Sequence, residues 1–419
     1  MTDTFFRYKQ GQLYCEDVAL AVLLRGVATP FYVYSRGRVQ TQARLFRQTV
    51  AELKQETLVC YAVKANGLTS LLRILADEGL GADIVSQGEL VRALRGGVKP
   101  DTIVFSGVGK SRDELKLAMN TGIKQINIES EAELQDIIEV AEEGGLRDVP
   151  CALRVNTDTP APTHRTIATA HKDDKFGIAI EAIPSLATRI ANHRQLRLCG
   201  LATHIGSNMT ELVAFKDAFI KLRELAWHLA GQGLTLETLD LGGGLASRSD
   251  DEDKALVTAY RDMIAEVFAD YGGTLIFEPG RFLMAKSGVL VSRVLRSKKA
   301  DKVTYLLIDA GMNDMMRTAL YDGCHPIKAV RQGEGQTYLY HVAGPICEST
   351  DVFQRDASLP RLERGDAVVL SDVGAYGSVL AHQYNARPLI AELLVDKGQH
   401  RVIKRSFSVD DALALEDDE

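Results

Sequence analysis

The chain has 419 residues, of which 46% are hydrophobic and 25% are charged, and its formal net charge is -7 at pH 7. This length exceeds one ordinary small domain, and the composition is that of a globular protein with ample material for a core. The negative charge and the lack of a basic stripe argue against a nucleic-acid-binding protein.

We expect neither a membrane span nor a secretion signal. The longest wholly apolar run, residues 18–24, is far shorter than a bilayer requires. The N-terminus has no basic segment followed by a hydrophobic stretch and a cleavage site. The six cysteines are scattered without a C-x-x-C pair, so we expect free thiols, no metal site and a reducing cytoplasm.

Strands and helices are predicted to alternate through residues 30–285. Two helix starts are marked by Ser111 and Ser130, each followed three positions later by a glutamate. Strand-like apolar runs occur at 57–63, 81–85, 102–106, 125–129, 150–155, 198–204, 236–241 and 274–278. Helix-like segments occur at 37–55, 70–79, 88–96, 111–121, 131–144, 181–193, 210–231 and 252–270. This alternation predicts a (β/α)8 barrel of the TIM type, with a doubly wound open sheet as the alternative.

The pattern changes after residue 285. Segments 287–297, 303–309, 337–343 and 366–371 read as strands separated by Gly, Asp and Pro turns. We therefore expect a second, β-rich domain, a sandwich or barrel, formed by residues 1–29 and 286–419.

Unusual polar residues follow many of the predicted barrel strands, at the end where barrel active sites lie. They are Lys64 after the first strand, Asp83 and Ser86 at the end of the second, Arg154 and Asn156 at the end of the fifth, His204 and Ser207 at the end of the sixth, Gly242–Gly244 after the seventh and Glu278–Arg281 after the eighth. Because polar residues stand at the same end of so many strands, the sequence predicts one site at this end of the barrel.

Lys64 ends the predicted strand Leu-Val-Cys-Tyr-Ala-Val. Most lysines are solvated surface charges. Partial desolvation at a strand end would lower the pKa of the ammonium and make a neutral, nucleophilic amine available, as a Schiff-base lysine requires.

Three further motifs fit a particular cofactor. The triple glycine 242–244 is either a tight turn or a phosphate cradle. His204 is either a core histidine or a residue that stacks on an aromatic ring. Glu278 pairs either with Arg281 or with a protonated ring nitrogen. A phosphate cradle, a stacking histidine and a glutamate that pairs with a ring nitrogen, together with Lys64, describe a pyridoxal phosphate site.

The β-rich region carries three motifs of its own. Cys347 lies among polar residues in Cys-Glu-Ser-Thr-Asp, where it could be an acid, a nucleophile or an ordinary turn residue. Arg317 and Tyr321 are four residues apart and share a face if helical. Tyr376 lies in the turn Gly-Ala-Tyr-Gly, which suits contact with a phosphate or carboxylate.

An ordered set of motifs resembles the diaminopimelate decarboxylases, within the pyridoxal-phosphate decarboxylases that share the alanine racemase-like barrel. The motifs are Tyr-Ala-Val-Lys-Ala-Asn (61–66), Gly-Ala-Asp-Ile-Val-Ser (81–86), Ile-Val-Phe-Ser-Gly-Val-Gly-Lys (103–110), Lys-Phe-Gly-Ile (175–178), His-Ile-Gly-Ser (204–207), Leu-Gly-Gly-Gly (241–244), Glu-Pro-Gly-Arg (278–281), Cys-Glu-Ser-Thr-Asp (347–351) and Gly-Ala-Tyr-Gly (374–377). They span almost the whole chain.

The resemblance implies a role for each matching residue. Lys64 would form the internal aldimine, His204 would stack on the ring, and Glu278 would pair with the pyridine nitrogen. The cofactor site would also include Asp83, Ser207, Gly243, Gly244, Gly280, Arg281 and Tyr376. The resemblance further implies a head-to-tail homodimer in which each of two shared sites takes Cys347 and Glu348 from the partner subunit.

The implied reaction is decarboxylation of meso-2,6-diaminopimelate to L-lysine, the last step of lysine biosynthesis. For the far end of the substrate, Arg281, Arg317, Tyr321 and Tyr376 would bind the carboxylate and Glu348 the ammonium. Cys347, or alternatively Lys64, would reprotonate the α carbon.

Three alternatives remain at this stage: a sister decarboxylase acting on ornithine, arginine or a carboxylated polyamine, a racemase, and a non-catalytic cofactor-binding regulator. Retention of both Lys64 and Cys347 argues against the regulator. Two positions depart from the family pattern. Thr318 stands where many members have proline, and Asn208 where glutamine is usual.

Overall fold

The computed structural model describes residues 4–160, 174–333 and 335–416. The chain divides into residues 42–283, here called the barrel unit, and residues 1–41 with 284–419, here called the β-rich unit. No helix among the described residues is both long and apolar enough to cross a membrane.

The barrel unit is built on a closed parallel sheet. Its strands lie in the order β9-β11-β12-β13-β5-β6-β7-β8, and β8 also pairs with β9, which closes the circle. These strands are β5 (Thr57–Ala62), β6 (Gly81–Ile84), β7 (Ile103–Phe105), β8 (Gln125–Ile128), β9 (Val149–Asn156), β11 (Leu196–Ala202), β12 (Thr238–Asp240) and β13 (Thr274–Phe277). Closure confirms the (β/α)8 barrel and excludes the open sheet. A short strand, β10 (Ile178–Ala179), adds to β9.

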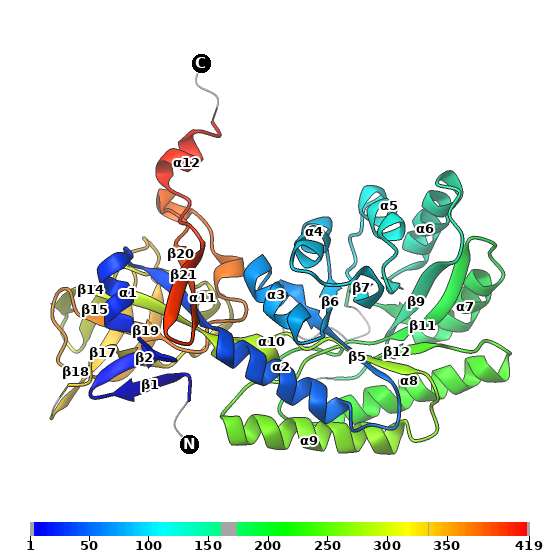
Figure 1. The fold of residues 1–419 in the computed structure, drawn as a ribbon, viewed down its shortest axis with the longest axis horizontal. Helices are drawn as coiled ribbons and strands as arrows, with labels where there is room; N and C mark the ends of the chain where they lie inside the picture. The colour runs from blue at the N-terminus through cyan, green and yellow to red at the C-terminus, as the bar shows by residue number, and fades with distance from the viewer. Residues whose placement is uncertain (1–3, 161–173, 334, 417–419) are drawn as a thin grey trace. The chain divides into compact units, whose positions relative to one another are not determined.

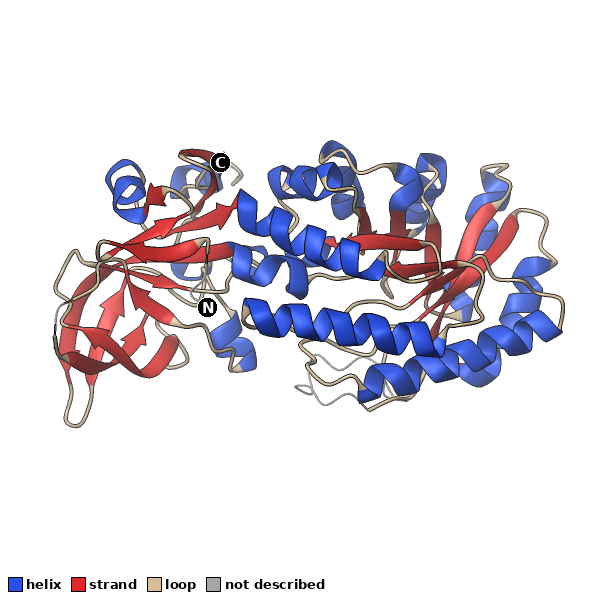
Figure 2. Ribbon diagram, turned by 60° about the horizontal axis from the view of Figure 1, so that its bottom comes forward, coloured by secondary structure: helices blue, strands red, loops and turns tan. Residues whose placement is uncertain are grey.

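Helices alternate with the strands along the chain (Figure 1) and lie outside the sheet (Figure 2). They are α2 (Arg36–Val50), α3 (Thr69–Asp77), α4 (Gln87–Arg95), α5 (Arg112–Thr121), α6 (Glu131–Glu143), α7 (Ile183–Ala191), α8 (Val213–Gly231) and α9 (Asp250–Val267). Their apolar faces cover the sheet. For example, the ring of Tyr260 in α9 lies 6.3 Å from that of Phe277 in β13, and Phe215 and Phe219 of α8 pack on the same tyrosine at 5.3 and 6.1 Å.

Both predicted helix starts are real, but they are capped differently. Ser111 and Glu114 form a reciprocal capping box at the start of α5. Ser130 caps α6 by accepting from the backbone N–H of Glu133. The Glu133 carboxylate is bonded instead to the Lys110 ammonium and to the backbone N–H of Glu129.

The β-rich unit contains two sheets, and the N-terminal strands belong to it, as expected from the sequence. The small sheet is β1 (Phe6–Lys9), β2 (Gln12–Cys15) and β3 (Val18–Ala19). The large sheet has the order β18-β17-β15-β14-β4-β20-β21, with β19 on β14 and β16 on β19. Its strands are β4 (Phe31–Ser35), β14 (Gly288–Lys299), β15 (Thr304–Ile308), β16 (Ile327–Ala329), β17 (Thr337–Ala343), β18 (Val352–Pro360), β19 (Ala367–Leu370), β20 (Ala391–Asp396) and β21 (Gln399–Lys404). The short helices α1 (Leu20–Gly26), α11 (Arg317–Tyr321) and α12 (Val409–Leu413) also belong to this unit, and α10 (Arg281–Met284) spans the point where the two units divide.

The division of the chain differs from the predicted boundary at residue 30. Strand β4 pairs antiparallel with β14 and parallel with β20. It therefore belongs to the β-rich unit, and the division falls within α2. No strand was predicted at residues 31–35, and their pairing partners show that they belong to the β-rich unit.

The core of the β-rich unit gathers around one face of β4. Phe31 and Val33 pack with Leu13 and Leu20 of the N-terminal segment and with Leu393 of β20. Because side chains alternate along a strand, Tyr32 and Tyr34 point to the opposite face of the sheet.

Candidate active site

Lys64 lies directly after β5, in a single 3-10 turn at Val63–Ala65. Its ammonium is 2.6 Å from Oδ2 of Asp83 at the end of β6, and the register Ala62↔Asp83 brings the two together. Asp83 is fully buried, whereas 36% of the Lys64 side chain is exposed. The lysine is therefore partly desolvated, as its place in the sequence predicts, and it has a buried carboxylate partner.

Three buried acids, Asp83, Asp240 and Glu278, lie at the same end of the barrel. Burial raises the pKa of Asp240, and it raises the pKa of Glu278 well above its usual value, with added effects of the Asp240 and Asp83 charges. Burial thus favours the protonated form of Glu278, whose carboxyl is hydrogen-bonded to Asp240. Ser106 also donates to Glu278 at 3.4 Å.

The glycine run after β12 is closely packed. A Cβ on Gly243 would lie 2.1 Å from the backbone oxygen of Glu278, and one on Gly244, with φ of +124°, would lie 2.5 Å from the backbone oxygen of Gly206. No side chain fits at either position. The backbone itself can therefore line a site closely, as a phosphate cradle requires.

His204 is a neutral imidazole in this arrangement. Burial lowers its pKa well below the usual value, and the positive charges of Arg154 and Lys64 lower it further. The backbone N–H of Gly243 donates to Nδ1 of His204 at 3.2 Å, which leaves the ring proton on Nε2. An uncharged flat ring suits stacking on an aromatic cofactor.

Ser207 and the glycine run are brought together by backbone contacts between the loops after β11 and β12. The N–H of Met209 donates to the oxygen of Gly244 at 3.0 Å. The Arg281 guanidinium donates to the Ser207 hydroxyl at 3.3 Å, so the loop after β13 reaches the same place. Gly280 is the last residue of that loop, directly before Arg281.

The residues at this end of the barrel fit pyridoxal phosphate. Oδ1 of Asp83 is buried and has no hydrogen-bond partner among the described residues. Buried carboxyl groups at this end of the barrel, Asp83, Asp240 and Glu278, would offer a partner to a protonated ring nitrogen. At Gly243 and Gly244 there is no room for a Cβ, so only backbone lines the site there.

In the β-rich unit, Arg317 lies between two aromatic rings. Its guanidinium carbon is 5.5 Å from the ring centre of Tyr321, four residues on in α11, and 5.9 Å from that of Tyr376. Arg317 is buried. The structure thus brings together three residues that the sequence placed 59 positions apart at most (376 minus 317).

Cys347 and Glu348 lie in a separate loop of the β-rich unit. Cys347 is exposed, and Glu348 accepts a hydrogen bond of 2.8 Å from the Tyr384 hydroxyl. Asp351, in the same loop, fixes its conformation. Its carboxylate accepts hydrogen bonds from the backbone N–H groups of Met312 and Ile346, both at 2.7 Å.

The two departures from the family pattern have different structural settings. Asn208 has φ of +68°, in the left-handed region that asparagine tolerates better than glutamine. Thr318 lies at the start of α11, and its hydroxyl is buried without a hydrogen-bond partner among the described residues.

Sequence reasoning missed a buried ionic network beside the site. The Lys110 ammonium is fully buried and lies 2.6 Å from Glu133. Glu129 accepts from Arg154 at 2.5 Å, and the Arg154 guanidinium lies 5.1 Å from the ring centre of Phe176. The sequence signal is that Lys110 stands in the loop after one apolar strand and Arg154 near the end of another.

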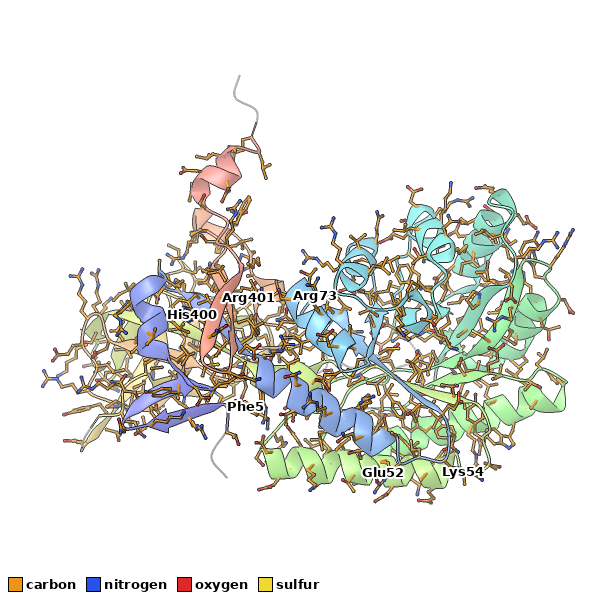
Figure 3. The ribbon with its side chains drawn as sticks, viewed as in Figure 1. Phe5, Glu52, Lys54, Arg73, His400 and Arg401 are labelled. Atoms are coloured by element: carbon orange, nitrogen blue, oxygen red, sulfur yellow. The ribbon has the colours of Figure 1, made fainter. Side chains whose placement is uncertain are left out.

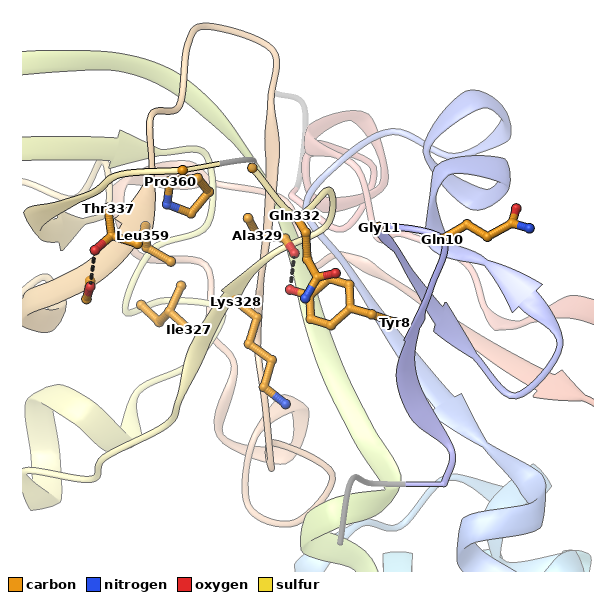
Figure 4. A pocket seen from close by; sticks show the side chains of 13 residues that line it. Tyr8, Gln10, Gly11, Ile327, Lys328, Ala329, Gln332, Thr337, Leu359 and Pro360 are labelled. Carbon is orange, nitrogen blue, oxygen red and sulfur yellow. Dashed lines mark hydrogen bonds between the residues drawn. The ribbon is translucent and has the colours of Figure 1, made fainter.

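A surface pocket of the β-rich unit lies elsewhere (Figure 4). It is lined by the N-terminal hairpin and by strands β16 to β18, and Tyr8 donates to the oxygen of Ala329 at its edge. None of the predicted site residues is among the described residues that line it.

Comparisons with known proteins agree with this chemistry. Residues 36–285 match the family model described as "Pyridoxal-dependent decarboxylase, pyridoxal binding domain". The chain is 41% identical over 411 residues to the diaminopimelate decarboxylase of Zymomonas mobilis, covering 97% of each. It is 41% identical to that of Pseudomonas aeruginosa, covering 98% of each.

The chain belongs to the diaminopimelate decarboxylases.

The diaminopimelate decarboxylase of M. jannaschii, crystallised in co-complex with L-lysine, has a similar fold. The TM-score is 0.92 at 32% identity, covering 99% of this chain and 98% of that one. Diaminopimelate decarboxylases are pyridoxal-phosphate-dependent carboxy-lyases, which agrees with the residues at the barrel end. The whole chain, not the barrel unit alone, is therefore characteristic of this family.

Proposed function

We propose that this chain decarboxylates meso-2,6-diaminopimelate to L-lysine and CO2, the last step of lysine biosynthesis, with pyridoxal 5'-phosphate as cofactor. The observation that carries the proposal is similarity to diaminopimelate decarboxylases over 97% of the chain, so it includes both units. L-lysine, the product, is present in the similar M. jannaschii structure.

We assign the cofactor contacts to residues at the barrel end and in one loop of the β-rich unit. Glu278 would hold the ring nitrogen, and His204 would stack on the ring. The phosphate would be held by Ser207, Gly243, Gly244 and Tyr376. Asp83, Gly280 and Arg281 complete the set. The buried acids and the side-chain-free glycine backbone support these assignments.

The bound cofactor supplies an electron-accepting ring conjugated to the reacting carbon. Lys64 supplies the amine, and Asp83 lies at hydrogen-bond distance to take its proton. Asp240 is positioned to accept the Glu278 proton or to share it. His204 remains uncharged, so it adds no positive charge to compete with the ring nitrogen.

We assign the recognition of diaminopimelate to groups that match its two ends. Arg281 and Arg317 would bind the distal carboxylate through fork-shaped donors, helped by Tyr321 and Tyr376. Glu348 would bind the distal ammonium. The Tyr321 and Tyr376 rings, 5.5 and 5.9 Å from the guanidinium carbon, limit the movement of Arg317 and so support bidentate binding.

The α carbon must be reprotonated once CO2 has left. We assign this step to Cys347, with Lys64 as the alternative donor. Cys347 is exposed in the isolated chain. We propose that it acts in a head-to-tail homodimer, in which each site takes Cys347 and Glu348 from the other subunit. The six cysteines are all free thiols, which also supports our proposal that the protein is located in the reducing cytoplasm.

The test is a CO2-release assay on purified protein with added pyridoxal phosphate. Meso-diaminopimelate, L-lysine, L-ornithine and L-arginine are offered separately, and the products are identified. Release from meso-diaminopimelate alone, with L-lysine formed, is the expected result. Preference for ornithine or arginine would overturn the roles of Arg281, Arg317 and Glu348 and leave the cofactor site intact.

A further inference from the structure

Two buried tyrosines of β4 lie side by side on one face of the large sheet. Tyr32 and Tyr34 are both fully buried, and their rings stack at a centroid distance of 6.2 Å with 7° between planes. Their hydroxyls reach two different segments of the β-rich unit. Each segment carries one residue of the proposed site.

Tyr34 is linked to the segment that carries Tyr376. Its hydroxyl donates to Oε2 of Glu392 at 2.6 Å, and the Lys404 ammonium is 2.8 Å from Oε1 of Glu392. Because the single Tyr34 proton points to Glu392, the Ser378 hydroxyl, 3.1 Å away, must be the donor to the Tyr34 oxygen. Ser378 stands two residues after Tyr376.

The backbone at Tyr376 needs such support. Tyr376 has φ of +56°, a strained value for a bulky side chain. A Cβ on Gly374 would lie 2.1 Å from the oxygen of Met284, and one on Gly377 would lie 2.4 Å from the oxygen of Val373. The turn is thus tightly packed on both sides of Tyr376, and strain of this kind persists only where the surroundings impose it.

Tyr32 is linked to the segment that carries Arg317. Its hydroxyl donates to the backbone oxygen of Asp314 at 2.6 Å and contacts the sulfur of Met315 at 3.8 Å. The Asp314 carboxylate accepts from the backbone N–H of Gly311 at 2.9 Å, which closes the turn. Arg317 follows three residues after Asp314.

We propose that Tyr32 and Tyr34 are positioning residues: Tyr34 sets Tyr376 for the cofactor phosphate, and Tyr32 sets Arg317 for the substrate carboxylate. The proposal rests on the proposed function for the roles of Tyr376 and Arg317. The two tyrosine hydroxyls bond to Asp314, Ser378 and Glu392, all in the β-rich unit. Because Arg317 also packs on the Tyr376 ring, one rigid strand would hold the two groups in register with each other.

The test compares Tyr34→Phe and Tyr32→Phe in the full-length protein. Two quantities are measured: the dissociation constant of pyridoxal phosphate, from absorbance titration, and KM for meso-diaminopimelate at saturating cofactor. Tyr34→Phe is expected to weaken cofactor binding about ten-fold, as for one lost buried hydrogen bond. Tyr32→Phe is expected to raise KM about five- to ten-fold and to leave cofactor affinity within about two-fold.

Ser378→Ala provides a second test that leaves both tyrosines in place. It removes only the link between Tyr34 and the turn, so it should weaken cofactor binding as Tyr34→Phe does. Ser358→Ala is the matched control, because the Ser358 hydroxyl bonds to Thr337 in an exposed part of the same unit. It should change neither quantity.

Two results would overturn the inference. In the first, Tyr34→Phe and Tyr32→Phe change cofactor affinity and KM for meso-diaminopimelate to the same extent. A general loss of stability would have that effect. In the second, Tyr376→Phe weakens cofactor binding but Tyr34→Phe and Ser378→Ala do not. If Tyr376→Phe itself leaves cofactor affinity unchanged, the proposed phosphate contact is wrong and the role of Tyr34 falls with it.

Discussion

The ammonium of Lys64 lies 2.6 Å from a carboxylate oxygen of Asp83, although the lysine is partly exposed and the aspartate is fully buried. Asp83 is held by β6, so its position depends on the barrel and not on the lysine. Because Lys64 approaches the buried Asp83 from the solvent side, its amine can exchange a proton with that carboxylate and can still contact a bound ligand. This relationship makes Lys64 the first residue to test.

Lys64→Ala is expected to abolish both the visible absorbance of lysine-bound cofactor and the decarboxylase activity, because no other amine would reach the cofactor carbon. Borohydride reduction followed by peptide mass analysis should find the cofactor on Lys64 in the wild-type protein. Lys54→Ala is the control, since Lys54 is exposed on the barrel unit (Figure 3). Wild-type activity in Lys64→Ala would disprove the assignment.

Gly243→Ala is expected to weaken pyridoxal phosphate binding at least about ten-fold, because its Cβ would lie 2.1 Å from the backbone oxygen of Glu278 and force the loop to move. Absorbance titration measures the loss. The control is Gly272→Ala in the same unit, where an added Cβ meets nothing within 4 Å. Equal affinities in the two variants would show that the glycine run does not form the phosphate cradle.

Arg317→Lys is expected to raise KM for meso-diaminopimelate about 10- to 100-fold and to change kcat less, because a lysine keeps the charge but loses the planar fork. Steady-state kinetics separate the two effects. Arg223→Lys is a matched control, since Arg223 also packs on an aromatic ring four residues on, that of Trp227, at 5.9 Å. An unchanged KM in Arg317→Lys would remove Arg317 from the substrate site.

Asp314 is expected to make stability depend on pH. Burial, with smaller effects of the Asp309 and Asp351 charges, raises its pKa to about 7, although its bond from Gly311 and the charge of Arg387 act in the opposite direction. The folded state therefore holds a proton that the unfolded state releases near pH 4. The stabilisation is complete below that pH and is lost as pH rises to about 7.

Asp314→Asn keeps the hydrogen-bonding shape but cannot titrate. Relative to this variant, the wild-type protein should lose about 3–4 kcal/mol of unfolding free energy between about pH 4 and pH 7. Urea unfolding of both proteins across this range measures the difference. A constant difference at all pH values would show that Asp314 does not titrate there.

Sharing of the active site between subunits can be tested by mixing two inactive variants. Lys64→Ala and Cys347→Ala should each be inactive, and their mixture should recover about a quarter of wild-type activity after subunit exchange. Random pairing makes half of the dimers mixed, and each mixed dimer has one intact site. No recovery after verified exchange would mean that Lys64 and Cys347 act within one chain.

The sequence by itself determined the barrel and the place of its chemistry. Each predicted strand of the barrel appears within a few residues of its expected position, because a buried parallel strand is a local run of apolar residues bounded by turns. Polar residues after such runs, among them Lys64 and His204, are visible for the same reason. In the β-rich unit, β21 was missed because it is an exposed edge strand rich in polar residues.

Only the tertiary structure decided which residues meet. Asp240, at the end of β12, is hydrogen-bonded to Glu278, directly after β13, and Glu133 bonds to Lys110 although its spacing predicted a helix cap. Strand β4 joined the β-rich unit because its pairing partners, β14 and β20, lie hundreds of residues later in the chain. Hydrophobic periodicity and helix-capping patterns depend on residues that are close together in the sequence. Hydrogen bonds and charges are satisfied by whatever the fold brings near, so their partners are decided only once the chain has folded.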